Sequence, residues 1–168
     1  MEAESALRRA KRPRTALAGP YGHPFHAMVI TIPIGAWVAA FVFDLVAIFG
    51  DQQETFARGA GWLIGIGLVG AAAAAVLGFL DYGTLTTGTK VKRTARTHMF
   101  LNIAVMALML ISWLVRLGNG FDEVSVAGFV LSLIALLLLA ASGYLGGELS
   151  YRHGVRVADE ETQIKAYR

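Results

Sequence analysis

Four histidines and a few charged side chains are the groups in this 168-residue chain that could carry chemistry. His26 and His98 stand where long apolar runs begin, while His23 and His153 lie in the polar segments beside such runs. Imidazole nitrogen is a common ligand of haem iron and of transition metals. Because the chain contains no cysteine, it offers no disulfide, no thiolate ligand for an iron–sulfur cluster and no thiol nucleophile.

The spacing between two of these histidines and two charged residues inside the apolar runs indicates helices. His26 and Asp44 are 18 residues apart, and so are His98 and Arg116. This spacing equals about five turns of a helix, so each histidine shares a helical face with one charge. Polar residues in membranes normally face the interior of a helix bundle. We therefore expect the two helices to face each other, with Asp44 and Arg116 forming a structural pair near the outer surface; a proton or ion step is the alternative.

Four apolar runs must position these groups. They cover residues 27–49, 60–80, 99–117 and 124–145. A helix needs about 20 residues to cross a membrane, and in lipid it satisfies its own backbone hydrogen bonds. The composition agrees, because only 16% of the residues are charged, compared with about 25% in soluble domains. The sequence predicts an all-α membrane protein, a four-transmembrane-helix up-down bundle.

The basic residues predict how this bundle is oriented. With four spans, both termini and the loop at 81–98 share one side, which carries thirteen Lys and Arg residues. The other side carries only Arg58 and Arg116. The positive-inside rule then places both termini in the cytoplasm. Topology and anionic lipid headgroups explain the net charge of +3, so we expect the lipid bilayer and no nucleic acid as a partner.

The segments outside the spans complete the predicted domain organisation. Residues 1–18 are predicted to be a basic N-terminal tail that is disordered or lies on the headgroups. Residues 19–157 form one membrane domain, and residues 158–168 form a C-terminal tail. No soluble catalytic domain, nucleotide-binding fingerprint or zinc-protease motif is found. The sequence therefore does not identify the protein as an enzyme.

The cytoplasmic ends of the predicted helices bring together two possible ligand sets. The more concrete hypothesis is a haem b held by His26 and His98, as axial imidazoles from two facing helices. Its predicted neighbours are Arg93, Arg96 or Arg152 at the propionates, and Gly78 and Gly143 beside the ring. The alternative is a non-haem transition metal held by the set His23, His26, Asp81, His98 and His153. The small residues of the second span are also interpreted as sites of close helix packing.

Several of these residues belong to motifs that resemble a known family. The motifs are Gly22-His23-Pro24-Phe25-His26, Ile32-Pro33-Ile34-Gly35 with Asp44, Asp81-Tyr82, Arg96-Thr97-His98, and the tail from Gly143 through Glu148, Tyr151, Arg152 and His153 to Val155. Over roughly residues 19–157 the chain resembles the bacterial membrane family called domain of unknown function 2231. The resemblance implies four spans in the bacterial cytoplasmic (inner) membrane but no established activity. Some relatives carry a Rieske iron–sulfur domain, which implies a redox partner protein.

Three functions remain open on the sequence alone. The first is a small redox or metal-binding membrane protein, in electron transfer through haem b or a transition metal. The second is a non-catalytic membrane component that binds a partner protein or lipid, with purely structural polar residues. The third is a pathway for protons or small ions along Asp44, Arg116 and the histidines. An ordinary secondary transporter is disfavoured, because such proteins use discontinuous helices and internal repeats.

Overall fold

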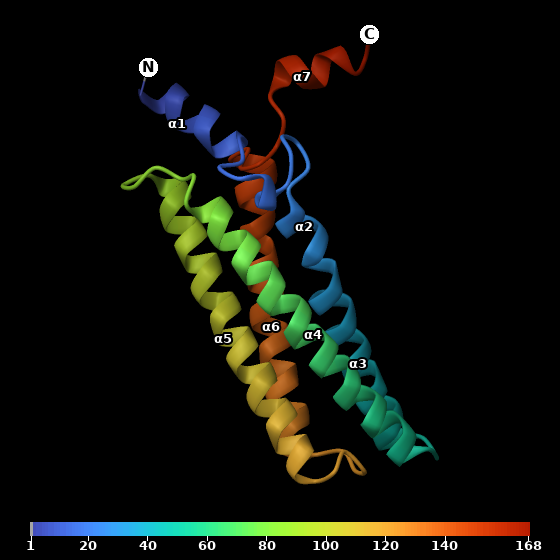
Figure 1. Cartoon of the computed structure of the whole chain (residues 1–168). Helices are drawn as coiled ribbons and strands as arrows, with labels where there is room; N and C mark the ends of the chain where they lie inside the picture. The colour runs from blue at the N-terminus through green and yellow to red at the C-terminus, as the bar shows by residue number, and fades with distance from the viewer. Residues whose placement is uncertain (1) are drawn as a thin grey trace.

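The computed structural model describes residues 2–168, and its main feature is a bundle of four long helices (Figure 1). The first span consists of α2 (Phe25–Val29) and α3 (Thr31–Phe49), which follow one another almost without a break. The other spans are α4 (Gln53–Tyr82), α5 (Lys90–Gly118) and α6 (Val126–Gly147). All four are long and apolar enough to cross a membrane. The prediction of an all-α, four-span bundle is confirmed.

The spans alternate in direction, so that both chain termini lie at the same end of the bundle, the upper end in Figure 1. We call this the terminal end, and the opposite end the loop end. α3 packs along α4 and α5 packs along α6, which makes two helical hairpins. The hairpins meet where α4 contacts α5 and α3 contacts α6. The first and third spans are therefore diagonal neighbours, and their side chains meet on the long axis of the bundle.

The middle of this axis is filled by apolar side chains. Trp37, Ile64, Val105, Met109 and Ala135 are all buried and belong to one cluster drawn from the four spans. The outward faces carry large apolar residues instead of charges, with Val69, Trp62 and Leu137 among the exposed ones. Helices that are apolar on every face are typical of membrane spans. The structure therefore has the distribution of side chains that a lipid surrounding requires.

The helices extend beyond the apolar runs from which they were predicted. α4 begins at Gln53 and α5 at Lys90, in polar sequence. The side chain of Thr89 caps α5 by accepting a hydrogen bond from the backbone N–H of Lys92 at 3.2 Å, and Ser125 caps α6 through Gly128 N–H at 3.2 Å. Hydropathy predicts only the part of a helix that lies in hydrocarbon. The caps, which determine the true helix starts, are local hydrogen bonds.

The N-terminal segment, predicted to be disordered or to lie on the headgroups, contains two short helices. α1 (Glu2–Lys11) docks at the terminal end, followed by the short helix η1 (Ala16–Ala18). Ala10 is buried in a second apolar cluster that includes Leu85 and Val155, and its carbonyl accepts a hydrogen bond from Arg156 N–H at 2.9 Å. The buried face of α1 consists of small residues. Hydropathy reveals long apolar runs, so it did not reveal this short and mostly polar helix.

The C-terminal segment completes the terminal end. α6 continues into a π-helical turn, η2 (Glu148–Arg152), and a last short helix, α7 (Glu160–Lys165), follows. Asp159 caps α7 by accepting a hydrogen bond from Thr162 N–H at 2.9 Å. The hydroxyl and backbone N–H of Thr162, together with Tyr21, lower the pKa of Asp159 to about 2. This carboxylate is therefore charged at neutral pH, as suits the N-terminus of a helix.

Candidate functional site

His26 lies near the start of the first span and is oriented by the neighbouring helix α4. Its Nδ1 lies 2.8 Å from the carbonyl oxygen of Ala74. Because a carbonyl can only accept, Nδ1 must carry the proton. The ring lies against Gly78, where an added Cβ would come within 2.9 Å of Cε1 of the histidine. Glycine at this position therefore makes room for the imidazole.

His98 near the start of the third span repeats this arrangement on α6. Its Nδ1 lies 2.9 Å from the carbonyl oxygen of Ser142, so this Nδ1 also carries the proton. A Cβ at Gly146 would lie 3.2 Å from Cε1 of His98. In both hairpins the accepting carbonyl comes four residues before the glycine. The two halves of the bundle thus build one histidine pocket each, by the same geometry.

The two histidine rings meet on the axis of the bundle. Their centroids are 6.4 Å apart, and their planes are inclined by 87°. Both side chains are half-buried. This proximity was predicted from their equal depth and from the shared helical faces. Sequence reasoning did not predict the carbonyl anchors on α4 and α6, because backbone acceptors leave no signal in residue types.

Asn102 and Ser142 complete the polar surroundings of His98. The amide nitrogen of Asn102 lies 2.8 Å from the carbonyl of His98, 2.7 Å from Oγ of Ser142 and 3.2 Å from Nε2 of His98. An amide has only two protons, so it cannot serve all three acceptors at once. The contact with Nε2 of His98 is the longest of the three and therefore the weakest hydrogen bond. Ser142 was missed as a site residue, although a serine four residues before Gly146 in an apolar span is a usable signal.

The second polar pair lies on the same axis towards the loop end. Arg116 donates from Nη1 and Nη2 to the two carboxylate oxygens of Asp44, both at 2.7 Å. The side chains are 1% and 0% exposed, so the pair is fully buried inside the bundle. Nε of Arg116 also donates to Ser112 Oγ at 3.3 Å. A parallel two-bond contact of this kind holds both groups in fixed geometry.

The five residues of the predicted metal set are not gathered into one site. Asp81 forms an ion pair with Arg156 at 2.9 Å, and His153 lies 3.9 Å from Glu148. Nδ1 of His23 lies 3.3 Å from the carbonyl oxygen of Tyr21 in its own loop. Within residues 2–168 no group of three or more His, Cys, Asp or Glu side chains is arranged to hold a metal ion. Equal membrane depth had suggested a cluster, but depth does not bring residues together laterally.

The predicted haem neighbours are only partly beside the histidines. Gly78 borders His26, as predicted. The second glycine that contacts a histidine ring is Gly146 and not the predicted Gly143. Apart from its immediate neighbours, no atom lies within 4 Å of a Cβ built on Gly143. Arg96 is exposed at the terminal end. Arg152 is also exposed, with Nη1 3.7 Å from Glu148. Both arginines remain free to turn towards an anion at this end of the bundle.

Arg156 is a structural residue that the sequence did not reveal. It is 3% exposed and has a positive φ of 60°. Its Nη2 donates to the carbonyls of Ala18 at 2.8 Å and Gly19 at 3.1 Å, while Nε faces Asp81 at the end of α4. The side chain therefore joins both terminal segments to the second span. The sequence signal for this structural role is the position of Arg156 directly after the His153-Gly154-Val155 motif.

Comparisons with known proteins give a family but no activity. A family model described as "Predicted membrane protein (DUF2231)" matches residues 22–159. Neither the curated proteins nor the solved structures contain a match to this chain.

Proposed function

The chain belongs to the DUF2231 family of predicted membrane proteins, and we propose that it is a redox component that holds a haem b between His26 and His98. The separation of 6.4 Å between the two ring centroids carries this proposal. A metal–imidazole bond is about 2 Å long, and a ring nitrogen lies about 1.1 Å from the centre of a ring whose bonds measure about 1.33 Å. Two imidazoles on opposite sides of one iron are therefore separated by about 6.3 Å.

The protonation of the two rings supports the same use. Metal-binding histidines typically donate Nδ1–H to a backbone carbonyl, which fixes the ring and leaves Nε2 as the ligand. Here the acceptors are Ala74 for His26 and Ser142 for His98. Within residues 2–168 nothing donates a hydrogen bond to Nε2 of His26. Nε2 of His98 has only its weak contact with Asn102. Both Nε2 atoms are therefore available as axial ligands.

Two protein ligands favour haem over a bare transition metal. Structural and catalytic sites for bare metals usually take three or four protein ligands, and the described residues bring only two imidazoles together. A haem needs no more than two axial ligands from the protein.

The chain's own residues would tune and shield such a group. When bound, haem supplies one-electron chemistry. The hydrogen bonds from Nδ1 to the carbonyls would fix the orientation of both rings. Arg96 and Arg152 are suited to pair with propionates at the terminal end. Ile64, Val105 and Met109 are essentially unexposed and separate the histidines from the Asp44–Arg116 pair. This dry apolar layer favours an electron carrier over a proton pathway.

Purification after expression with iron and a haem precursor tests the proposal. The wild-type protein in mild detergent should show a Soret band that sharpens on reduction, and elemental analysis should give about one iron per chain. His26→Ala and His98→Ala should each abolish the band, because each removes one axial ligand. His23→Ala and His153→Ala are matched controls at the same end, and both should retain it.

Two results would overturn the haem proposal. One is a folded wild-type preparation that is colourless and metal-free under these conditions. The other is a band that survives His26→Ala and His98→Ala, or that is lost equally with His153→Ala. In the first case the polar residues are structural, and loss of each imidazole should lower the free energy of unfolding by only about 1 kcal/mol.

A further inference from the structure

A second candidate site lies at the terminal end, away from the histidines. It is an open cavity of about 410 Å³; α1 and the segment after it form one side, and the loop that follows α4 forms the other. Its polar lining consists of Arg9, Arg12, Arg14, Thr84, Thr86 and Thr87. None of the residues lining it, all within the described 2–168, is an aspartate or a glutamate. We call it the arginine cavity.

The three guanidinium groups of the arginine cavity are held by separate contacts. Arg9 donates from Nη2 to Thr86 Oγ1 at 3.1 Å, and Arg14 donates from Nη1 to the carbonyl of Gly83 at 3.1 Å. Arg12 stacks over the ring of Tyr21 at 5.7 Å. Each guanidinium has five N–H donors, so most of these donors remain available to a ligand.

The walls of the arginine cavity are fixed to the bundle. On one side α1 is held by the hydrogen bond from Arg156 N–H to the carbonyl of Ala10. On the other side the loop is held by Lys92, whose Nζ donates to the carbonyl of Tyr82 at 2.8 Å. Thr84 Oγ1 also donates to the carbonyl of Asp81 at 2.7 Å. Binding groups on supported elements lose little entropy when a ligand arrives.

The charges around this cavity are unbalanced. Like charges that share a small volume repel each other, and a bound anion relieves that repulsion. The nearest carboxylate in sequence to its loop, Asp81, is already paired with Arg156. Glu4 on α1 is paired with Arg8, which is not part of the lining. The cavity therefore presents three cations without a counter-ion of its own.

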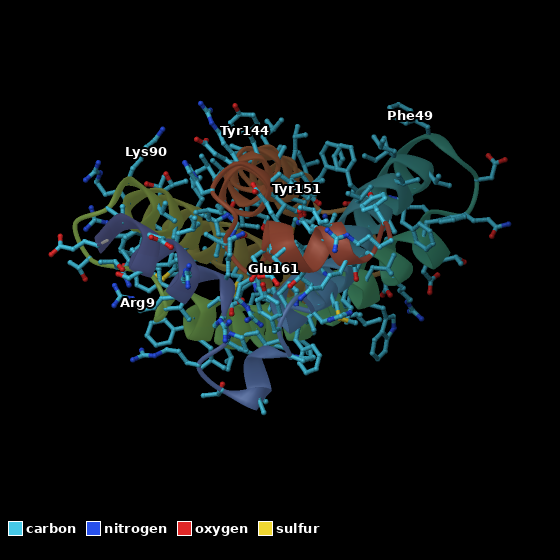
Figure 2. All side chains as sticks on the ribbon, turned by 90° about the horizontal axis from the view of Figure 1, so that it is seen from above. Arg9, Phe49, Lys90, Tyr144, Tyr151 and Glu161 are labelled. Carbon is cyan, nitrogen blue, oxygen red and sulfur yellow. The ribbon has the colours of Figure 1, made fainter. Side chains whose placement is uncertain are left out.

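From this arrangement we propose that the arginine cavity binds the phosphate group of an anionic ligand. Guanidinium donors match the oxygens of phosphate in pairs, and threonine hydroxyls add further hydrogen bonds. The cavity adjoins the end of α4, where Phe79 is 65% exposed as a lipid-facing residue. Figure 2, seen from the terminal end, shows Arg9 at the periphery of the bundle. Basic pockets at this level of a membrane protein bind phospholipid headgroups, and soluble phosphate has the same chemistry.

Binding measurements on the full chain in uncharged detergent test the proposal and separate the two sources. One arm titrates inorganic phosphate. The other compares phosphatidylglycerol with phosphatidylcholine in mixed micelles. We expect phosphatidylglycerol to bind about tenfold more tightly than phosphatidylcholine at low salt, because near-surface arginines each add to the affinity for anionic lipid. If inorganic phosphate binds as tightly as phosphatidylglycerol, the ligand of the cavity is a soluble phosphate compound.

Charge-matched variants locate the site. The triple variant Arg9→Gln, Arg12→Gln, Arg14→Gln should lose the preference for the anionic ligand. The control Arg8→Gln, Lys165→Gln, Arg168→Gln removes the same charge from exposed positions at the same end and should retain it. Thr86→Val keeps all the charges but frees Arg9, and should weaken binding about threefold even if the triple variant fails to fold.

Three results contradict the arginine cavity as a phosphate site. These are equal losses in the two triple variants, no effect of Thr86→Val, and no preference of the wild type for phosphate-bearing anions over phosphatidylcholine. The first would mean that general surface charge attracts the ligand. The histidines do not line the cavity, so these results are independent of whether haem is bound.

Discussion

The Asp44–Arg116 pair explains how two charges are accommodated inside apolar spans. Each carboxylate oxygen accepts a bond from one guanidinium nitrogen at 2.7 Å, and Ser112 accepts from the remaining Nε. Ser112 Oγ in turn lies 2.8 Å from the carbonyl of Gly128 and donates to it. Removing charges from water is costly, and it is tolerated only where such partners are complete. This contact therefore joins the first and third spans and fixes the position of one helix along the other.

Substitution of this pair should show strong coupling. Asp44→Leu or Arg116→Met leaves one buried charge without its partner, which typically costs about 3–5 kcal/mol of stability. The double substitution removes both charges at similar volume. It should lie within about 1 kcal/mol of the wild type for the same reason. Unfolding in mixtures of mild and denaturing detergent measures these differences, and additive losses would contradict the coupling.

The pair formed by Arg58 and Asp122 is a matched control at the same end of the bundle. Its atoms are equally close, at 2.6 Å, but both side chains are 54% exposed. Solvent screens such a contact. The corresponding cycle with Arg58→Met and Asp122→Leu should therefore give additive, small effects. A coupling as large as that of the buried pair would mean that burial is not its source.

Which site residues could be predicted depends on how their contacts arise. The 18-residue spacings predicted the pairing of His26 with His98 and of Asp44 with Arg116, because helical periodicity is local. The burial of Arg156 could not be predicted, since it depends on how the chain returns to the terminal end after η2. The five-residue metal set had only a shared depth in common. A lateral contact between helices requires a shared helical face as well as a shared depth, and the metal set offered only the depth.

The glycines of α4 and α6 leave room for aromatic and imidazole rings from neighbouring helices. Gly78 of α4 and Gly146 of α6 each leave room for an imidazole. Gly67 of α4 leaves room for the indole of Trp37, which an added Cβ would overlap. The small residues thus form slots for rings from neighbouring helices more than surfaces for close backbone contact. The spans themselves were predictable from hydropathy. This use of the glycines was not, because it depends on which rings face them.

Two glycines of α6 provide a test of these slots. Gly146→Ala puts a Cβ 3.2 Å from His98 Cε1, so the net effect should be destabilising, by about 1 kcal/mol, since overpacking costs exceed the helix-propensity gain. The Cβ that Gly143→Ala adds has open space around it, with no atom of a neighbouring helix within 4 Å. It should stabilise α6 by about 0.5–1 kcal/mol, because alanine favours helix. Equal effects in detergent unfolding would show that the slot at His98 does not constrain the helix.

The whole molecule has two chemically different ends. The terminal end carries the docked α1, the arginine cavity and the histidine pair. At the loop end Arg116 is buried in its ion pair, and Arg58 is held by Glu54 and Asp122. The positive-inside rule counts Lys and Arg near the ends of spans and gives acidic residues little weight, so the terminal end should face the cytoplasm.

Single-cysteine labelling tests this orientation directly, because the chain has no cysteine of its own. Asn119→Cys places a thiol in the exposed loop between α5 and α6, and Tyr167→Cys places one at a position that is 93% exposed beside the C-terminus. A membrane-impermeant maleimide on intact cells should label the first variant and not the second, since only the loop end is expected outside. Permeabilised cells should label both, which controls for accessibility. The reverse pattern would put the basic terminal end outside, against the charge rule, and the arginine cavity would then meet the ligands of the opposite compartment.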